Sequence, residues 1–337
     1  MLKMFTREMF PRRGSVSLSE AFVIGACIFA TVAVTDRHYA DILILTFLWA
    51  GMALAWNVAG GYAGLISFGH AAFFGISAYG STLLLVRFGL TPWIGIWIGA
   101  ALAGVFGALL ALICARLRGP FFILSTLAAG EVVRIAALNW RDLTGGSEGL
   151  EIPPVFGFYN MVFASHHTYM ALILAYFVGM FLLCKHIERS RFGFYLFATR
   201  DDEDGASAVG VDPLWMRVRA MGLSAFLTGI GGSLFAQYFL YLDPTHVISP
   251  ELSFQFALIC AIGGLATATG PVLGAFVVIP LSELLRSSLG GGASGLHLVV
   301  YGIALVIVIL YFPGGIAGAL ARLGRRHVVS PAAQPTR

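Results

Sequence analysis

A run of four acidic residues interrupts an otherwise apolar part of the chain: Asp201, Asp202, Glu203 and Asp204. They lie in the segment 197–213, FATRDDEDGASAVGVDP, which is too polar to lie in a membrane. Thr199 followed by Asp202 has the spacing of a capping box, and carboxylates in a first turn are stabilised by the helix dipole. Gly210 is a typical C-terminal stop, and Pro213 cannot continue a helix. The segment therefore predicts a short helix of about ten residues.

This expected helix is better suited to binding a protein than to spanning a bilayer, for which roughly 20 residues are needed. Its small apolar side chains, Ala206, Ala208 and Val209, would let it enter a groove on another protein. An acidic run that simply faces water is the alternative interpretation.

Further charges occur inside apolar runs, where ionisable side chains are costly and usually paired or functional. Glu131 and Arg134 are one helical turn apart, and so are Glu283 and Arg286. Each pair could neutralise itself within one helix, or the pairs could ring an external entrance. His70 is either a proton relay or a hydrogen-bonded packing residue.

Residue patterns for catalysis are missing from the sequence. It contains no G-x-x-x-x-G-K-[ST] phosphate loop, no nucleophile elbow, no H-E-x-x-H and no metal-ligand spacing. The four cysteines lie in apolar runs and form no CxxC pair. We therefore expect that the chain is no enzyme and holds no metal or cofactor of its own.

Membrane spans must position these charges. The chain has 337 residues, of which 58% are hydrophobic and 11% charged, whereas soluble proteins average about 25% charged residues. This composition predicts an all-α polytopic membrane protein with about ten transmembrane helices, the last over 296–312, and with glycine-broken segments. The net charge of +4 is too small to suggest nucleic-acid binding.

Apolar runs and polar breaks divide the chain into a basic arm (1–17), a transmembrane domain (18–318) and a tail (319–337). The first apolar run resembles a signal peptide, but the many runs that follow favour an uncleaved first span. With ten spans, the arm, Arg116 and Arg118, the segment 185–219 and the tail lie on one side. The positive-inside rule makes that side cytoplasmic, with both termini inside and the segment 139–167 outside.

Glycine is concentrated in two zones, 60–69 and 263–274, at which expected spans break. Broken backbone at membrane depth needs protein or water as its partner, and in transporters such breaks line the substrate passage. Close packing of helices through small residues is the alternative. The candidate passage residues are Asn57, Gly60, Gly61, Gly64, Ser67, Gly69, His70, Gly263 and Gly264.

Five segments, in order, resemble the permease family of branched-chain amino acid ABC transporters, and more closely its LivM-type branch. They are NVAGGYAGLISFGHAAFFGISAY (57–79), RLRGPFFILSTLAAGEVVRI (116–135), TGGSEGL (144–150), SRFGFYLFATRDDEDGASAVGVD (190–212) and YFPGGIAG (311–318). The resemblance covers most of the chain and implies a permease of a bacterial inner membrane.

The resemblance also implies partners and a role for the acidic segment. Partners would be a second, LivH-type permease, two ATPase subunits that hold ATP and Mg²⁺ at the cytoplasmic face, and a periplasmic substrate-binding protein. Segment 204–210 resembles the coupling loop of importers, whose Glu-Ala-Ala-x-x-x-Gly pattern here has glycine in place of its first alanine. The implied ATPase-coupling residues are Arg200, Asp201, Asp202, Glu203, Asp204, Gly205, Ala206, Gly210 and Asp212.

Branched-chain or related amino acids are the substrates that the resemblance favours, and urea or short amides are the alternative within the same family. An ion-driven secondary transporter is the rival from another class, and Glu131 and Glu283 are the carboxylates that it would use for coupling. A non-transporting scaffold would have no need for glycine-broken spans.

Overall fold

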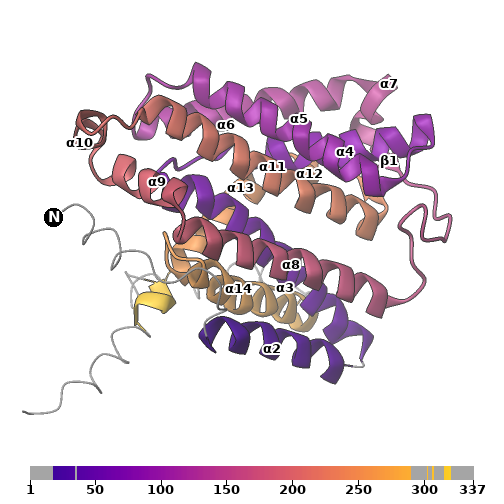
Figure 1. Ribbon diagram of the computed structural model, residues 1–337. Helices are drawn as coiled ribbons and strands as arrows, with labels where there is room; N and C mark the ends of the chain where they lie inside the picture. The colour runs from indigo at the N-terminus through magenta and orange to yellow at the C-terminus, as the bar shows by residue number, and fades with distance from the viewer. Residues whose placement is uncertain (1–17, 35, 290–301, 303–305, 307–314, 320–337) are drawn as a thin grey trace, which may run out of the picture.

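The computed structural model describes residues 18–34, 36–289, 302, 306 and 315–319, and this part of the chain is almost entirely helical. Long helices run side by side as a bundle (Figure 1). In the described residues the sheet structure is one pair of two-residue strands, β1 and β2. The all-α membrane fold expected from the composition is confirmed.

Eight helical stretches among the described residues are long and apolar enough to cross a membrane. They are α3 with its extension η1 (Arg37–Asn57, Val58–Tyr62), α4 (His70–Phe88), α5 (Pro92–Ile113), α6 (Pro120–Asn139), α8 (His166–Glu188), α11 (Pro213–Phe239), α12 with α13 (Pro244–Val247, Pro250–Gly263) and α14 (Thr269–Leu289). The first expected span is α2 (Leu18–Ala33), a helix of 16 residues. The tenth expected span, 296–312, and the basic arm 1–17 fall outside the described residues apart from positions 302 and 306.

Short elements mark the two ends of the bundle. Figure 1 shows α9 (Arg191–Asp201) and α10 (Glu203–Ala208) at one end, and α7 (Arg141–Thr144) and β1 (Leu150–Glu151) at the other. Following the expected orientation, we call the α10 end the inner side and the opposite end the outer side. On the outer side, η2 (Gly146–Glu148) precedes β1, which pairs antiparallel with β2 (Tyr241–Leu242) at the end of α11.

Burial distinguishes a central helix from a peripheral one. In the apolar window of α3, 89% of the residues are buried, against 22% in α6. The side chain of Phe47 in α3 stacks on Phe177 of α8 and contacts the edge of Phe276 of α14. The core therefore lies around α3, and most of α6 faces away from it.

Helices α4, α5 and α11 pack closely through small residues. A Cβ added at Gly99 of α5 would lie 2.7 Å from the Ser77 carbonyl oxygen of α4. One added at Gly229 of α11 would lie 2.9 Å from the Cα of Ala100 in α5. Such contacts let membrane helices approach each other to van der Waals distance, so these three helices form one tightly packed block.

The first glycine zone breaks the central helix as expected. After Asn57 the helix widens into the π-helical turn η1, and the chain then runs without helix through 63–69 before α4 begins. Gly64 has a φ of +69°, which a residue with a side chain adopts only at a cost. α3 therefore ends in irregular backbone that lies beside the other broken elements.

Candidate functional site

The acidic segment forms two helices rather than the single one expected. Asp202 takes an extended conformation between α9 and α10 (φ −151°, ψ 105°), and its carboxylate accepts a hydrogen bond from the Gly205 N–H at 3.0 Å. Thr199 lies inside α9, where its hydroxyl donates to the Tyr195 carbonyl. The expected capping box at Thr199 is therefore wrong. The ionised carboxylate of Asp202 is the stronger acceptor for free N-terminal N–H groups, and it caps α10 instead.

The end of α10 is as expected. Gly210 has a φ of +86°. Its N–H donates to the Ser207 carbonyl, and the Val211 N–H donates to the Ala206 carbonyl, each at 3.0 Å. These are the two bonds of a Schellman motif, in which glycine is favoured because it has no Cβ to oppose the left-handed conformation.

The small residues of α10 point in different directions. Ala206 is 4% exposed and packs against its own chain, whereas Ala208 is exposed. Ala206 therefore cannot present its methyl group to a partner's groove. A surface hollow of about 270 Å³ lies beside α10 instead, lined by Phe194, Tyr195, Ala198, Val209, Gly210, Val211, Asp212 and Met216. Val209 and Phe194 are among its exposed apolar side chains.

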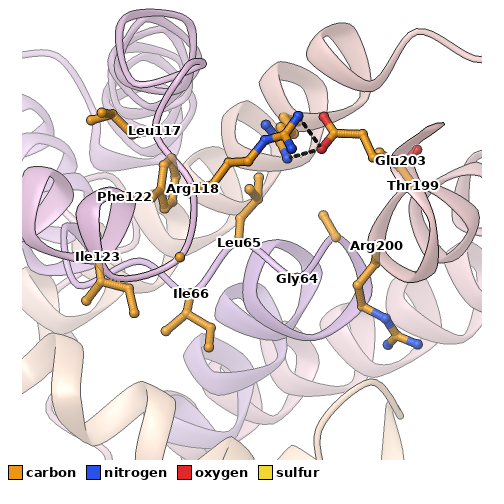
Figure 2. Close-up of a pocket in the computed structure, with 13 residues that line it drawn as sticks. Gly64, Leu65, Ile66, Leu117, Arg118, Phe122, Ile123, Thr199, Arg200 and Glu203 are labelled. Carbon is orange, nitrogen blue, oxygen red and sulfur yellow. Dashed lines mark hydrogen bonds and ion pairs between the residues drawn. The ribbon is translucent and has the colours of Figure 1, made fainter. Parts of the chain in front are cut away.

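Glu203 fastens α10 to the membrane domain. Its Oε2 is 2.9 Å from Nη2 of Arg217 in α11 and 3.2 Å from Nη2 of Arg118 in the α5–α6 loop. Arg217 also donates to the Ala115 carbonyl in that loop at 3.3 Å. Figure 2 shows the guanidinium of Arg118 reaching across to Glu203. We call Glu203, Arg118 and Arg217 the inner latch.

Below the latch lies a cavity of about 230 Å³ that is open on one side. The picture of this cavity places the α6 start on one wall, α9 on the other, and Gly64, Leu65 and Ile66 between them (Figure 2). Its charged lining residues are Arg118, Arg200, Glu203 and Arg217. The cavity thus joins the acidic segment to the extended stretch that follows the broken α3.

Arg200 makes a second connection from α9 to the broken helix. Its Nη1 donates to the Gly61 carbonyl in η1 at 3.1 Å, while Nη2 is 2.7 Å from the Asp201 carboxylate. A Cβ added at Gly64 would lie 2.7 Å from the Cγ of Arg200, so the glycine leaves room for this side chain. Of the expected coupling residues, Arg200 and Glu203 therefore bind the chain's own membrane domain.

The two glycine zones meet at Asn57. Its buried side-chain amide donates to the Thr267 carbonyl and accepts from the Ala266 N–H, both at 3.1 Å. The same turn is held by Glu188 at the end of α8, whose Oε1 accepts from the Ala268 N–H (2.5 Å) and from the Tyr62 hydroxyl (3.2 Å). Side chains from α3 and α8 thus satisfy backbone groups that the broken α13–α14 hairpin leaves free.

Most of the expected passage residues lie inside the chain. Asn57, Gly60, Gly61, Ser67, Gly69, His70, Gly263 and Gly264 are buried, and Gly64 is exposed. A Cβ on Gly263 would overlap the Gly270 carbonyl, so these glycines permit contact between α13 and α14. The His70 Nε2 is 2.8 Å from the Ser224 hydroxyl oxygen, which places it in a hydrogen-bonded core position. Residues 66 and 68 reach the surface instead.

Both Glu-x-x-Arg pairs form ion pairs within their helices. Arg134 donates from Nε to Glu131 Oε2 at 2.8 Å and from Nη2 to the other carboxylate oxygen. Arg286 lies 2.9 Å from Glu283 on α14. Both pairs are therefore neutralised within one helix.

A protein-family model, described as the permease component of the branched-chain amino acid transport system, matches residues 38–309 of the sequence. The chain belongs to this permease family. It is 26% identical over 328 residues to the high-affinity branched-chain amino acid transport system permease protein LivM of Escherichia coli K12, with 90% of this chain and 76% of the relative covered.

Two further relatives come from Methanocaldococcus jannaschii. The probable branched-chain amino acid transport permease protein LivM is 24% identical over 82% of this chain and 93% of its own length. The probable LivH protein is 26% identical over 83% of this chain and 90% of its own length. No solved structure gave a significant match. This member of the permease family is an integral membrane protein, and relatives of the two permease types imply a second permease as its partner.

Sequence reasoning missed three side chains that hold the elements of the site together in this permease. Arg118 and Arg217 contact Glu203 from 85 and 14 positions away, and Glu188 contacts Ala268 from 80 positions away. Such separations leave no local periodicity to detect. One signal was available for Arg118, because it follows directly on a span in the segment that resembles the family.

Proposed function

We propose that this permease is the membrane subunit of an ATP-driven importer for branched-chain or related amino acids, and that it forms the passage with a second permease. The observation that carries the proposal is that the acidic corner, by which we mean α9 and α10, is attached to the membrane domain at two points. Glu203 ties α10 to the α5–α6 loop, and Arg200 ties α9 to η1 at the end of the central helix. Relatives named for branched-chain amino acid transport support the substrate class.

The ATPase subunits, with their ATP and Mg²⁺, would bind at the inner side beside α10. The hollow lined by Phe194, Val209 and Met216 is suited to this, because Val209 is 80% exposed and Phe194 49% exposed on an otherwise charged corner. Exposed apolar side chains rimmed by polar ones are typical of protein interfaces. Hydrolysis would occur on those partners and not on this chain.

Delivery of the solute would occur from the outer side. We infer a bacterial inner-membrane location with both termini cytoplasmic, as the distribution of basic residues indicates. A periplasmic binding protein would present the solute to the segment 139–167, in which α7, η2 and β1 lie.

Uptake by the reconstituted complex tests the proposal. Both permeases, the ATPases and the binding protein are placed in proteoliposomes, and uptake of labelled leucine is measured with internal ATP, with a non-hydrolysable analogue and with an ionophore. We expect uptake that requires ATP and survives the ionophore. Uptake that persists without ATP and collapses with the ionophore would establish the ion-driven class instead. Competition by unlabelled urea or acetamide, but not by valine, would assign the amide substrates.

A further inference from the structure

The peripheral helix α6 carries an ion pair within the membrane. Glu131 and Arg134 are 34% and 26% exposed in their side chains, on the least buried of the spans that the structure describes. Arg134 is five residues before the end of α6 at Asn139, or about 8 Å inside the outer end at 1.5 Å per residue. Charges at such depth face protein or water rather than lipid.

Beside α6 runs a non-helical stretch in which some residues are exposed. The stretch 63–69 is not helical, and Gly64 and Ile66 within it are exposed. It is held against α6, since the Phe68 N–H donates to the Thr126 hydroxyl at 3.1 Å. Irregular backbone of this kind does not occur against lipid at membrane depth. The surface over 63–69 therefore needs a cover of protein or water.

The third member of this surface is α13, which is only 14 residues long and ends at the broken backbone of Gly264. Phe254 of α13 packs its ring against Phe68, with 4.4 Å between centroids, and is itself 43% exposed. Glu251, in the first turn of α13, is close enough to interact electrostatically with Arg134. Segment 63–69 and α13 thus continue the charged flank of α6 as one surface.

The chemistry of this surface changes in order from the outer to the inner side. Charges lie at the outer end, apolar Ile66, Phe68 and Phe254 lie in the middle, and the cavity with the inner latch lies at the inner end. Ile66 and Ile123 of α6 both line that cavity, which makes the surface continuous with it.

The exposed side of α5 provides the contrast. Its 22 residues contain no charged side chain, and Trp97, Leu102 and Val105 are each more than half exposed. An apolar helix of this kind is satisfied by lipid. The chain therefore has one exposed side that suits contact with lipid, and another whose charges and irregular backbone need protein or water as partners.

We propose that the surface formed by α6, segment 63–69 and α13 packs against the second permease and, between the two chains, lines the solute passage. This passage face rests on the proposed function for its partner and its solute. The second permease supplies the helices that cover the exposed residues of segment 63–69, and the gap between the two chains holds the water that solvates Glu131, Arg134 and Glu251. The α5 side faces lipid.

Photo-crosslinking in native membranes tests the passage face. p-Benzoyl-phenylalanine is placed at Val132 of α6 and at Phe254 of α13, and at Val105 of α5 as the matched control; Val132 and Val105 are 66% and 59% exposed. We expect adducts with a sister permease of the family from 132 and 254, identified by mass spectrometry, and lipid adducts from 105. Permease adducts at 105 with lipid adducts at 132 and 254 would overturn the assignment. Adducts joining two copies of this chain would overturn the choice of partner.

The same membranes separate this inference from the proposed function. ATP-dependent uptake together with crosslinks at 105 alone would refute the passage face and leave the importer intact. Crosslinks at 132 and 254 together with uptake driven by an ion gradient would refute the importer and leave the face. Retention of the sister permease on purification of each variant shows whether the chain has assembled.

Discussion

The inner latch allows a quantitative test of how the acidic corner is held against the membrane domain. Replacing Glu203 by Gln removes the charge that Arg217 and Arg118 share while keeping the size of the side chain. The Arg217 contact is mostly buried, with 19% and 24% of the two side chains exposed, whereas Arg118 is 73% exposed. A hydrogen bond to a charged group contributes about 1.5–3 kcal/mol, and an exposed ion pair about 0.2–1 kcal/mol. The Arg217 contact should therefore carry most of the stabilisation.

Because glutamine retains a neutral hydrogen bond, we expect Glu203→Gln to weaken the docking of α10 by about 1–2 kcal/mol. This corresponds to a roughly 5- to 30-fold faster exchange of the α10 amides, at 1.4 kcal/mol per tenfold. Hydrogen exchange is read at Ala206, Gly210 and Val211, whose amides are bonded within the corner. Exchange should rise as much in Arg217→Gln and less than about fivefold in Arg118→Gln.

The neighbouring residue Asp204, which is exposed, provides the matched control. Asp204→Asn removes the same charge one position along the helix and should leave exchange in the corner within twofold of the parent. Unchanged exchange in Glu203→Gln, or a larger effect from Arg118 than from Arg217, would refute the latch as the structure that holds α10. Retention of the ATPase on purification shows whether the loosened helix still docks.

Four further substitutions test the packing of the acidic segment, the binding of the ATPase and the α13–α14 turn. Ala206→Trp should destabilise the packing of α10, because Ala206 is buried, and the destabilisation should appear as faster hydrogen exchange of the α10 amides in the isolated permease. Val209→Asp, at an exposed position, should leave hydrogen exchange unchanged but release the ATPase on purification. Gly205→Ala should raise exchange in α10 by a few fold, because the new Cβ would collide with the Asp202 carboxylate that caps the helix. Asn57→Ala should lower the thermal stability of the purified permease, since it leaves two backbone groups of the α13–α14 turn without their partner, each worth about 1–3 kcal/mol.

The sequence was sufficient to predict the elements whose cause is local. Long apolar runs predicted the spans, because a membrane requires about 20 consecutive apolar residues whatever lies beside them. The end of α10 was also local, since the left-handed conformation at Gly210 depends on the missing Cβ of that residue. The start of α10 was less certain, because Thr199 and Asp202 both offer a cap and the choice depends on where α9 ends.

The contacts that organise the site were beyond sequence reasoning because they join distant residues. Asn57 bonds to a turn about 210 positions away, and Arg200 bonds to Gly61 across 139 positions. The sequence indicated Asn57, Gly61 and Arg200 as candidate functional residues because of their residue types and the segments in which they lie. It did not indicate that Asn57 would join the two zones, or that most of their glycines would be buried while Ile66 beside them is exposed.

The arrangement of stiff and irregular parts suggests how a movement of α10 would spread. α4, α5 and α11 are in close contact through Gly99 and Gly229, so they should move as a block. Arg217 of the inner latch ties α10 to α11 of this block, whereas Arg118 lies in the α5–α6 loop and Arg200 bonds to η1, where the backbone is not a regular α-helix. A movement of α9 would therefore act through Arg200 on the irregular backbone that leads into segment 63–69. That segment is part of the passage face. The α9–α10 pair and the passage face are therefore connected through one deformable segment, while the helices around it keep their packing.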